Sequence, residues 1–221
     1  MTPVRITVRG THTVRVRPEQ ATINATLSGE GPAAEPVFQA VTAALAEVAG
    51  SLEIRCRPRR GPVTRYSVDQ IRMGSYRPPR PDRAELAPIH TAAVPITATF
   101  TDFDDLAAWV QWCAGVAGFG MTGIHWSLGE ARRRKVERKT RRQAVRDAGR
   151  RARDYADALD LGSVEATSIN ESGPGGAAPR PMLMAKASAA PADGPGDFSL
   201  RPDDVEVTAE VEAVFTATSG G

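Results

Sequence analysis

Five arginines spaced four residues apart form the most regular pattern of charged side chains in this sequence. They are Arg134, Arg138, Arg142, Arg146 and Arg150. On a helix this spacing puts them in one row, where like charges repel by about 0.2–0.5 kcal/mol per pair. Glu130, Glu137 and Asp147 each precede an arginine by four residues and relieve part of the excess positive charge. We call this row the arginine ridge, and it is the first candidate for binding.

Three interpretations of the arginine ridge stay open. A run of charge is most often a solvated helix face. Arg138, Arg142 and Arg146 have no acidic residue three or four positions away, so an acidic partner within the chain or on another subunit is the second interpretation. A polyanion such as nucleic acid is the third. Against it, Tyr155 is the only aromatic residue between positions 130 and 160, and the sequence lacks helix-turn-helix, zinc-finger and RNA-recognition signatures.

The other residues that could do chemistry are scattered. His12, His90 and His125 lie in separate strand or turn contexts, and neither Cys56 nor Cys113 stands at metal-ligand spacing from them. The GPGG sequence that starts at position 173 is followed by Ala and Pro, whereas a phosphate-binding loop continues with Lys and Ser or Thr. No nucleophile and base can be paired. We therefore expect no catalytic, cofactor or metal site, and we predict that the protein is not an enzyme.

The ridge requires one long helix to carry it. Residues Glu130 to Leu161 contain a single glycine, Gly149, and no proline, and apolar or small residues recur every three or four positions. This stripe comprises Val136, Thr140, Ala144, Ala148, Ala152, Ala156 and Leu159. We predict a helix over this range that ends at Gly162. Because the stripe is narrow and mostly alanine, a sheet or a partner helix must approach it closely.

Alternating apolar and polar residues predict the strands. Residues 4–16 alternate, with a bend or bulge expected at Gly10, and 205–215 alternate most regularly. The first stretch has arginines between its apolar residues and the last has glutamates, so we expect the last strand to pair with one of the first two. Within 89–100, Pro95 predicts an edge position or a bulge. Further strands are predicted over 21–27, 63–73, 121–128 and 164–169.

The order of elements predicts an α+β fold with a mainly antiparallel sheet and helices packed on one face. Helices are expected over 32–50 and from an Asp102 cap to about Ala117. From about 20 to 128 the order β-α-β-β-α-β is that of a ferredoxin-like segment. Residues 1–19 with 129–221, including the long Arg-rich helix, either extend that sheet or complete a second lobe. Residues 172–202, rich in Gly, Pro and Ala, are predicted to be a flexible loop.

Composition and charge are those of a soluble globular protein. The sequence is 41% hydrophobic and 24% charged, with a net charge of +2. Residues 130–160 hold 12 Lys and Arg against 6 Asp and Glu, so a basic helix sits in an acidic body. No uninterrupted apolar run approaches the roughly 18 residues of a membrane span. The N-terminus enters a strand pattern without a charged leader and an apolar stretch, so we expect a cytoplasmic protein.

Several stretches, taken together, resemble one known family. VRGTHTVRVRPEQATINATLS is similar to that family's opening, in which a strand with a Gly turn is followed by a Pro-acid-x-Ala step and a second strand. ITATFTDFDDLAAWV and GMTGIHWSL are similar to its strand, helix and G-x-x-x-I-x-x-x-x-L strand. RRQAVRDAGRRARDYADALDLG, with SINES beyond it, resembles its Ala-spaced helix ending in Leu-Gly, and VEVTAEVEAVF resembles its closing strand. The family is the SIMPL domain family.

This resemblance covers nearly the whole chain, and it implies a bacterial α+β domain whose biochemical role is largely unknown. It supplies no catalytic residues, and because some SIMPL proteins are exported oligomeric surface antigens, it implies a homo-oligomer. We therefore expect a non-catalytic module that is not a stable monomer and that acts through self-association or by binding a protein partner. The alternative is nucleic-acid or polyanion binding through the basic helix at 130–160.

Overall fold

The protein has the α+β architecture that the sequence predicts. The structure is a computed structural model that describes residues 3–56, 61–78, 87–171 and 200–219. Those residues form three helices and eight strands in two antiparallel sheets. The described residues divide into two compact units, unit 1 from residues 3–17, 128–171 and 204–219 and unit 2 from residues 18–56, 61–78, 87–127 and 200–203. The predicted loop at 172–202 lies, up to residue 199, outside the described residues.

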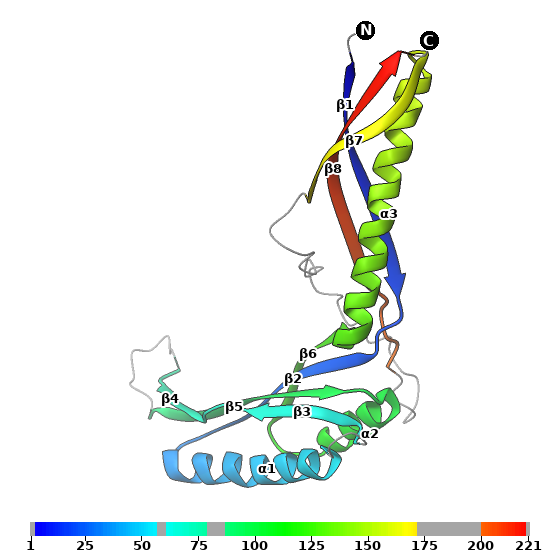
Figure 1. The fold of residues 1–221 in the computed structure, drawn as a ribbon. Helices are drawn as coiled ribbons and strands as arrows, with labels where there is room; N and C mark the ends of the chain where they lie inside the picture. Colours follow the sequence, from blue (N-terminus) through cyan, green and yellow to red (C-terminus); the bar gives the residue numbers. More distant parts are fainter. Residues whose placement is uncertain (1–2, 57–60, 79–86, 172–199, 220–221) are drawn as a thin grey trace, which may run out of the picture. The chain divides into compact units, whose positions relative to one another are not determined.

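Unit 1 is a three-stranded sheet with one helix on one face. Its strands are β1 (Val4–Val16), β8 (Val205–Ser219) and β7 (Leu161–Glu171), in the order β1-β8-β7. Helix α3 (Glu130–Asp157) runs along one face of this sheet (Figure 1). β1 pairs antiparallel with β8 over its whole length. This confirms the prediction that the last strand pairs with one of the first two.

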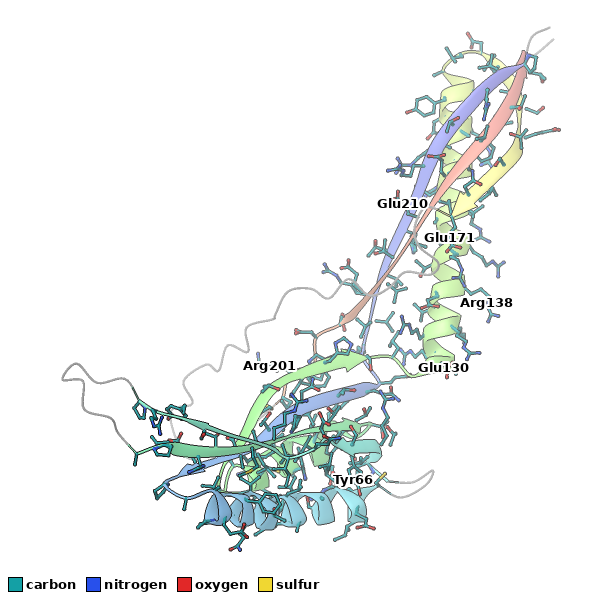
Figure 2. All side chains as sticks on the ribbon, turned by 90° about the vertical axis from the view of Figure 1, so that its left-hand side faces the viewer. Tyr66, Glu130, Arg138, Glu171, Arg201 and Glu210 are labelled. Carbon is teal, nitrogen blue, oxygen red and sulfur yellow. The ribbon has the colours of Figure 1, made fainter. Side chains whose placement is uncertain are left out.

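Arginine and glutamate face each other on the side of this sheet that is turned away from α3. Arg15 Nε lies 3.3 Å from Glu206 Oε2, directly across the strands, and Arg9 Nε lies 3.0 Å from Glu210 Oε1 along a diagonal. Figure 2 shows Glu210 on the face opposite α3. These side chains are exposed, and exposed ion pairs contribute about 0.2–1 kcal/mol each. The apolar side of the sheet therefore contributes more to the register than the charges do.

Small side chains let α3 approach the sheet closely. The buried residues of the helix are Thr140, Ala144, Ala148, Ala152 and Ala156. They pack against apolar residues of β1 and β8, among them Ile6 and Phe215. The approach is closest at Gly10, where an added Cβ would lie 2.2 Å from the carbonyl oxygen of Ala144 and 2.6 Å from the nitrogen of Ala148. Of the bend or bulge expected at Gly10, the bulge is absent, because β1 passes through this residue without a register shift. Gly10 instead makes room for the helix.

α3 ends earlier than the sequence pattern indicates. Its last helical residue is Asp157, and a turn over 158–160 leads into β7. Asp160 makes the reversal with a left-handed φ of 53°, a conformation that Asp adopts more readily than most residues. Gly162, which was expected to stop the helix, lies within β7. Leu159 is 62% exposed and does not belong to the buried stripe.

Unit 2 holds the second antiparallel sheet, with two helices on one face (Figure 1). Its strands are β2 (Gln20–Gly31), β3 (Val63–Val68), β4 (Arg72–Tyr76), β5 (Ile89–Phe100) and β6 (Phe119–Ser127), and its helices are α1 (Ala34–Arg55) and α2 (Phe103–Cys113). The strand order is β3-β5-β2-β6, and β4 also pairs with β5. The stretch predicted as one strand over 63–73 is therefore two strands, because it contains all of β3 and the first two residues of β4. With β4 set aside, the order matches a split β-α-β unit.

Pro95 lies in a central strand, and the edge position expected for it is wrong. β5 pairs with β2 on one side and with β3 and β4 on the other. The N–H of Asp69 donates to the carbonyl oxygen of Pro95 at 3.0 Å, so the backbone of Pro95 faces the gap after Val68 and before Arg72. Proline has no N–H to donate. Because the neighbouring strand is interrupted at this point, no ladder hydrogen bond is lost.

The core of unit 2 lies between its sheet and its two helices. Trp109 of α2 is fully buried, with its ring centroid 5.4 Å from that of Phe100. Its Nε1 donates a hydrogen bond of 3.0 Å to Ser51 Oγ on α1, which ties the two helices together. Asp102 caps α2 as predicted, because its Oδ1 accepts from two backbone N–H groups of the first turn at 3.0 Å each.

The close approach at Gly10 leads to a stability prediction. Gly10→Ala should lower the free energy of unfolding of unit 1 by about 1–3 kcal/mol, because the new Cβ meets backbone atoms of α3 that cannot rotate away. Gly149→Ala on α3 is the control, since nothing lies closer than 3.9 Å to its Cβ position. It should raise the free energy of unfolding by about 0.5–1 kcal/mol. Urea denaturation followed by circular dichroism measures both. Equal stability of Gly10→Ala and wild type would contradict this packing.

Candidate interaction surfaces

The arginine ridge lies on the side of α3 that faces away from the sheet. Each ridge residue stands two positions before a member of the apolar stripe, as Arg142 stands before Ala144. Two residues correspond to about 200° of rotation around a helix, so ridge and stripe occupy opposite sides. All five ridge arginines are exposed. Figure 2 shows Arg138 pointing away from the strands. The structure thus brings the five predicted residues together on one solvent-facing row.

The two ends of the ridge are ion-paired within α3. Arg134 pairs with Glu130, and Arg150 NH2 lies 3.1 Å from Asp147 Oδ1. The hydrogen bond from Arg134 lowers the pKa of the Glu130 carboxyl, and the same bond raises the pKa of Arg134. These ends are therefore at least partly neutralised by their own helix.

The middle of the ridge has no such neutralisation in the described part of the chain. No ion pair joins Arg138, Arg142 or Arg146 to an acid among the described residues. Glu137, which precedes Arg141 by four residues, pairs instead with Arg133. Arg141 NH1 reaches Glu171 of β7 at 4.0 Å. The three central arginines are the part of the ridge that can bind an external anion without breaking one of these contacts.

Asp147 joins α3 to the outer edge of β1. Its Oδ2 accepts the backbone N–H of Thr11 at 3.1 Å and the Nε of Arg151 at 2.9 Å. The bond from Thr11, helped by Arg151 and Arg150, lowers the pKa of the Asp147 carboxyl below its ordinary value. The carboxylate therefore stays charged to more acidic pH than a solvated aspartate does. Sequence reasoning treated Asp147 only as a local partner of Arg151 and missed this contact.

Helix α1 carries an apolar side that is exposed. Its buried residues are Val37, Val41, Val48 and Leu52. An 18-residue window of the helix has a mean hydropathy of 1.3, but only 22% of that window is buried. Phe38 is 39% exposed and Ile54 is 67% exposed. By length and composition α1 is the one described helix that could cross a membrane, although its buried residues belong to the core of unit 2. Polar residues such as Gln39 and Glu47 interrupt the apolar run of α1, so the sequence alone does not indicate this property.

Reactive side chains do not form a cluster in the described part of the chain. Burial raises the pKa of the Cys113 thiol to about 12, so it is not a thiolate nucleophile at neutral pH. His12, His90 and His125 lie on β1, β5 and β6. Among the residues that the structure describes, no three His, Cys, Asp or Glu side chains are placed to hold a metal ion together. The GPGG sequence lies outside the described residues.

Two hollows on the described surface are lined by polar residue types. One of about 430 Å³ along α3 is lined by Asp147, Arg150, Arg151, Arg153, Asp154 and Asp157. Another of about 360 Å³ on unit 2 is lined by Arg65, Tyr66, Ser67, Thr97 and Thr99. Small-molecule pockets are predominantly apolar with a few placed polar groups. Charged side chains dominate the hollow along α3, so the more distinctive surfaces are the ridge, the β1 edge and the exposed side of α1.

The comparison with known proteins agrees with this fold. The sequence model of the SIMPL family, described as "Protein of unknown function (DUF541)", matches residues 6–215. The chain belongs to the SIMPL family. A search among curated proteins found no match to it. The SIMPL match extends from β1 to β8 and so includes both units, which confirms the resemblance drawn from the motifs. The family description assigns no activity to a SIMPL chain.

The contact between Asp147 and Thr11 predicts a pH-dependent stability. The folded-state pKa of Asp147 lies below the ordinary value of 3.8. Its stabilising contribution is therefore present above that pH and is lost as the pH falls through the lowered pKa. At about pH 7, Asp147→Asn should lower the free energy of unfolding by roughly 1–2 kcal/mol, the scale of a hydrogen bond to a charged group.

Urea denaturation near neutral pH and near pH 2 measures this effect. The difference between wild type and Asp147→Asn should shrink as the pH falls below 3.8 toward the lowered pKa of Asp147. Asp154→Asn is the matched control on the same helix and should leave stability unchanged, since no ion pair with a described residue is lost. A difference that persists at acidic pH would mean that the charge of Asp147 is not its source.

Proposed function

We propose that this SIMPL chain is a non-catalytic interaction module that acts by self-association, with α1 as the surface that a second copy covers. The supporting observation is the exposed apolar side of α1. A helix that is apolar around most of its circumference is normally enclosed on all sides, whereas α1 buries only four of its residues. Contact with a second copy removes that surface from water, which is the usual role of exposed apolar patches.

The exposed side of α1 has the composition of a helix-packing surface. Ala40, Ala43 and Ala46 are exposed along its middle, and small side chains allow a second helix to approach closely. Ile54 lies on the same side as these alanines and is 67% exposed, whereas Phe38, 39% exposed, lies nearer the buried side of the helix. Burial of such area contributes about 25 cal/mol per Å². Small side chains in the middle, with a large exposed apolar group at Ile54, suit a protein contact.

A second copy is favoured over a lipid surface as the occupant. Glu35, Glu47 and Glu53 are exposed along α1. A charged residue costs about 2.5–3.5 kcal/mol at the centre of a membrane-spanning helix, whereas a protein surface can offer it a hydrogen-bonding partner. The alanine stripe of α3, in contrast, already packs on β1 and β8 of the same chain. It adds no reason for self-association, so the proposal depends on α1.

Light scattering tests self-association directly. At tens of micromolar, the wild-type chain should have a mass that is a multiple of the monomer mass. Ala43→Glu should weaken the association at least tenfold, about 1.4 kcal/mol, because it places an unpaired charge in the contact. Ala131→Glu, at an exposed position of α3, is the matched control and should leave the mass unchanged. A monomeric wild type, or equal masses for the two variants, would contradict the proposal.

A second candidate function is binding of a polyanion such as nucleic acid to the arginine ridge. The observation in its favour is that Arg138, Arg142 and Arg146 are exposed and have no ion pair within the described residues. Phosphate groups that meet these arginines would release counterions, which gives the affinity a steep dependence on salt.

Two triple variants test the polyanion candidate in a gel-shift titration with double-stranded DNA across salt concentrations. Changing Arg138, Arg142 and Arg146 to Gln should lower the slope of log affinity against log salt by about 2.7, since each lost phosphate contact removes about 0.9. Changing the ion-paired Arg133, Arg134 and Arg151 to Gln removes the same charge and should alter the slope much less. No shift at low salt, or equal losses in both variants, would exclude the three central arginines of the ridge as this site.

A further inference from the structure

The outer edge of β1 presents a row of backbone groups that β8 does not use. In an antiparallel pair the N–H and C=O of one residue point to the same side, and successive residues alternate sides. The N–H of Thr11 donates to Asp147 on α3 and not to β8. The odd-numbered residues of β1, from Arg5 to Arg15, therefore turn their backbone groups outward. Within the described chain no strand pairs with this side, because β1 is the first strand in the sheet order.

β1 is the better formed of the two edges of this sheet. It is 13 residues long, contains no proline and pairs with β8 without a register shift. The opposite edge, β7, shifts twice against β8, between Leu161 and Val164 and between Ala166 and Ser168. Such bulges are one way in which proteins make an edge unfit for pairing. β1 lacks this protection and can accept a further strand along its length.

Asp147 already occupies one position that an added strand would take. Its Oδ2 lies 3.1 Å from the N–H of Thr11, where the carbonyl oxygen of a partner strand would accept the same hydrogen bond. An incoming strand has to displace this carboxylate. The Asp147 carboxylate then keeps its ion pairs with Arg150 and Arg151, and the N–H of Thr11 bonds to the incoming strand. Neither the carboxylate nor the N–H is left without a partner. Exchanging one acceptor for another at Thr11 has a small net cost.

The charge on this edge selects the chemistry of the incoming strand. Arg5, Arg9 and Arg15 project from odd positions of β1 and are exposed. The strand already paired with them, β8, offers glutamates, which contact the Nε atoms of Arg9 and Arg15. Each guanidinium group carries further N–H donors that can pair with an additional acid. Acids across from them would add about 0.2–1 kcal/mol per pair.

We propose that the edge of β1 binds an extended acidic segment of a partner protein by strand addition. On binding, the N–H of Thr11 exchanges its hydrogen bond to Asp147 for one to a carbonyl oxygen of the incoming strand. Hydrogen bonds along the edge provide the affinity, and acids at alternate positions over Arg5, Arg9 and Arg15 provide the selectivity. A second copy of β1 is disfavoured because it would bring arginines toward arginines. This site is separate from α1 and goes beyond the proposed self-association.

Peptide binding to the full chain tests this proposal. The probe is a fluorescent nine-residue peptide of alternating Thr and Glu, with the Thr-Lys peptide and an N-methylated Thr-Glu peptide as controls. Fluorescence anisotropy should show binding of the Thr-Glu peptide alone. Asp147→Ala should bind it at least threefold more tightly, because the N–H of Thr11 is no longer taken. Asp154→Ala, which changes the same charge on the same helix, should bind like wild type.

Amide hydrogen exchange locates the bound peptide. The amides of Thr7, Arg9 and Thr13 should become slower on binding, while those of Ile6 and Val8, which face β8, report that Asp147→Ala is folded. If neither wild type nor Asp147→Ala binds the Thr-Glu peptide, the proposal is overturned, and the contact of Asp147 with Thr11 only caps the edge of β1. Two other outcomes would also overturn the proposal. In the first, the N-methylated peptide still binds; in the second, binding disappears when Arg138, Arg142 and Arg146 are changed to Gln. Either would place the peptide on the arginine ridge.

Discussion

The backbone of α3 lies against the backbone of β1 at Gly10, and the construction of unit 1 depends on this contact. A Cβ at Gly10 would lie 2.2 Å from the carbonyl oxygen of Ala144, so the helix side that faces the sheet has room only for small residues. It carries four alanines and Thr140, whose hydroxyl is satisfied by the carbonyl oxygen of Val136 at 2.9 Å. Each alanine buries little area, but many close contacts add dispersion energy over the length of the helix.

The same contact sets the position of the charges on unit 1. Because the small residues recur every four positions on the sheet side, the arginines two positions earlier recur on the opposite side and face solvent. Asp147 lies at the flank next to β1 and reaches Thr11. The exposure of the arginine ridge and the state of the β1 edge thus follow from one packing arrangement. Helix α1 in unit 2 differs, since it rests on its sheet through valines and a leucine and leaves a second apolar side exposed.

Local periodicity explains what the sequence predicts well. Alternation and four-residue spacing indicate β1, β8, α3 and the arginine ridge, because each pattern is complete within its own element. Other features depend on a partner that is distant in sequence. A glycine in a strand indicates either a bend or a close approach, and only the position of α3 decides for Gly10. Pro95 breaks the edge rule because its neighbouring strand is interrupted, which no local pattern in 63–73 reveals. The bond from Thr11 to Asp147 joins residues 136 positions apart.

Amide hydrogen exchange in a chain that ends before Val205 tests the central pairing of unit 1 most directly. Without β8, β1 loses the strand that it pairs with along its whole length, and α3 loses part of the surface beneath it. The amides of Ile6 and Val8 should then exchange as fast as those of an unfolded chain, while Ile23 and Val94 in the central strands of unit 2 stay protected. If Ile6 and Val8 remain protected in the truncated chain, β8 does not hold β1 in place, and the pairing that joins the two ends of the chain is contradicted.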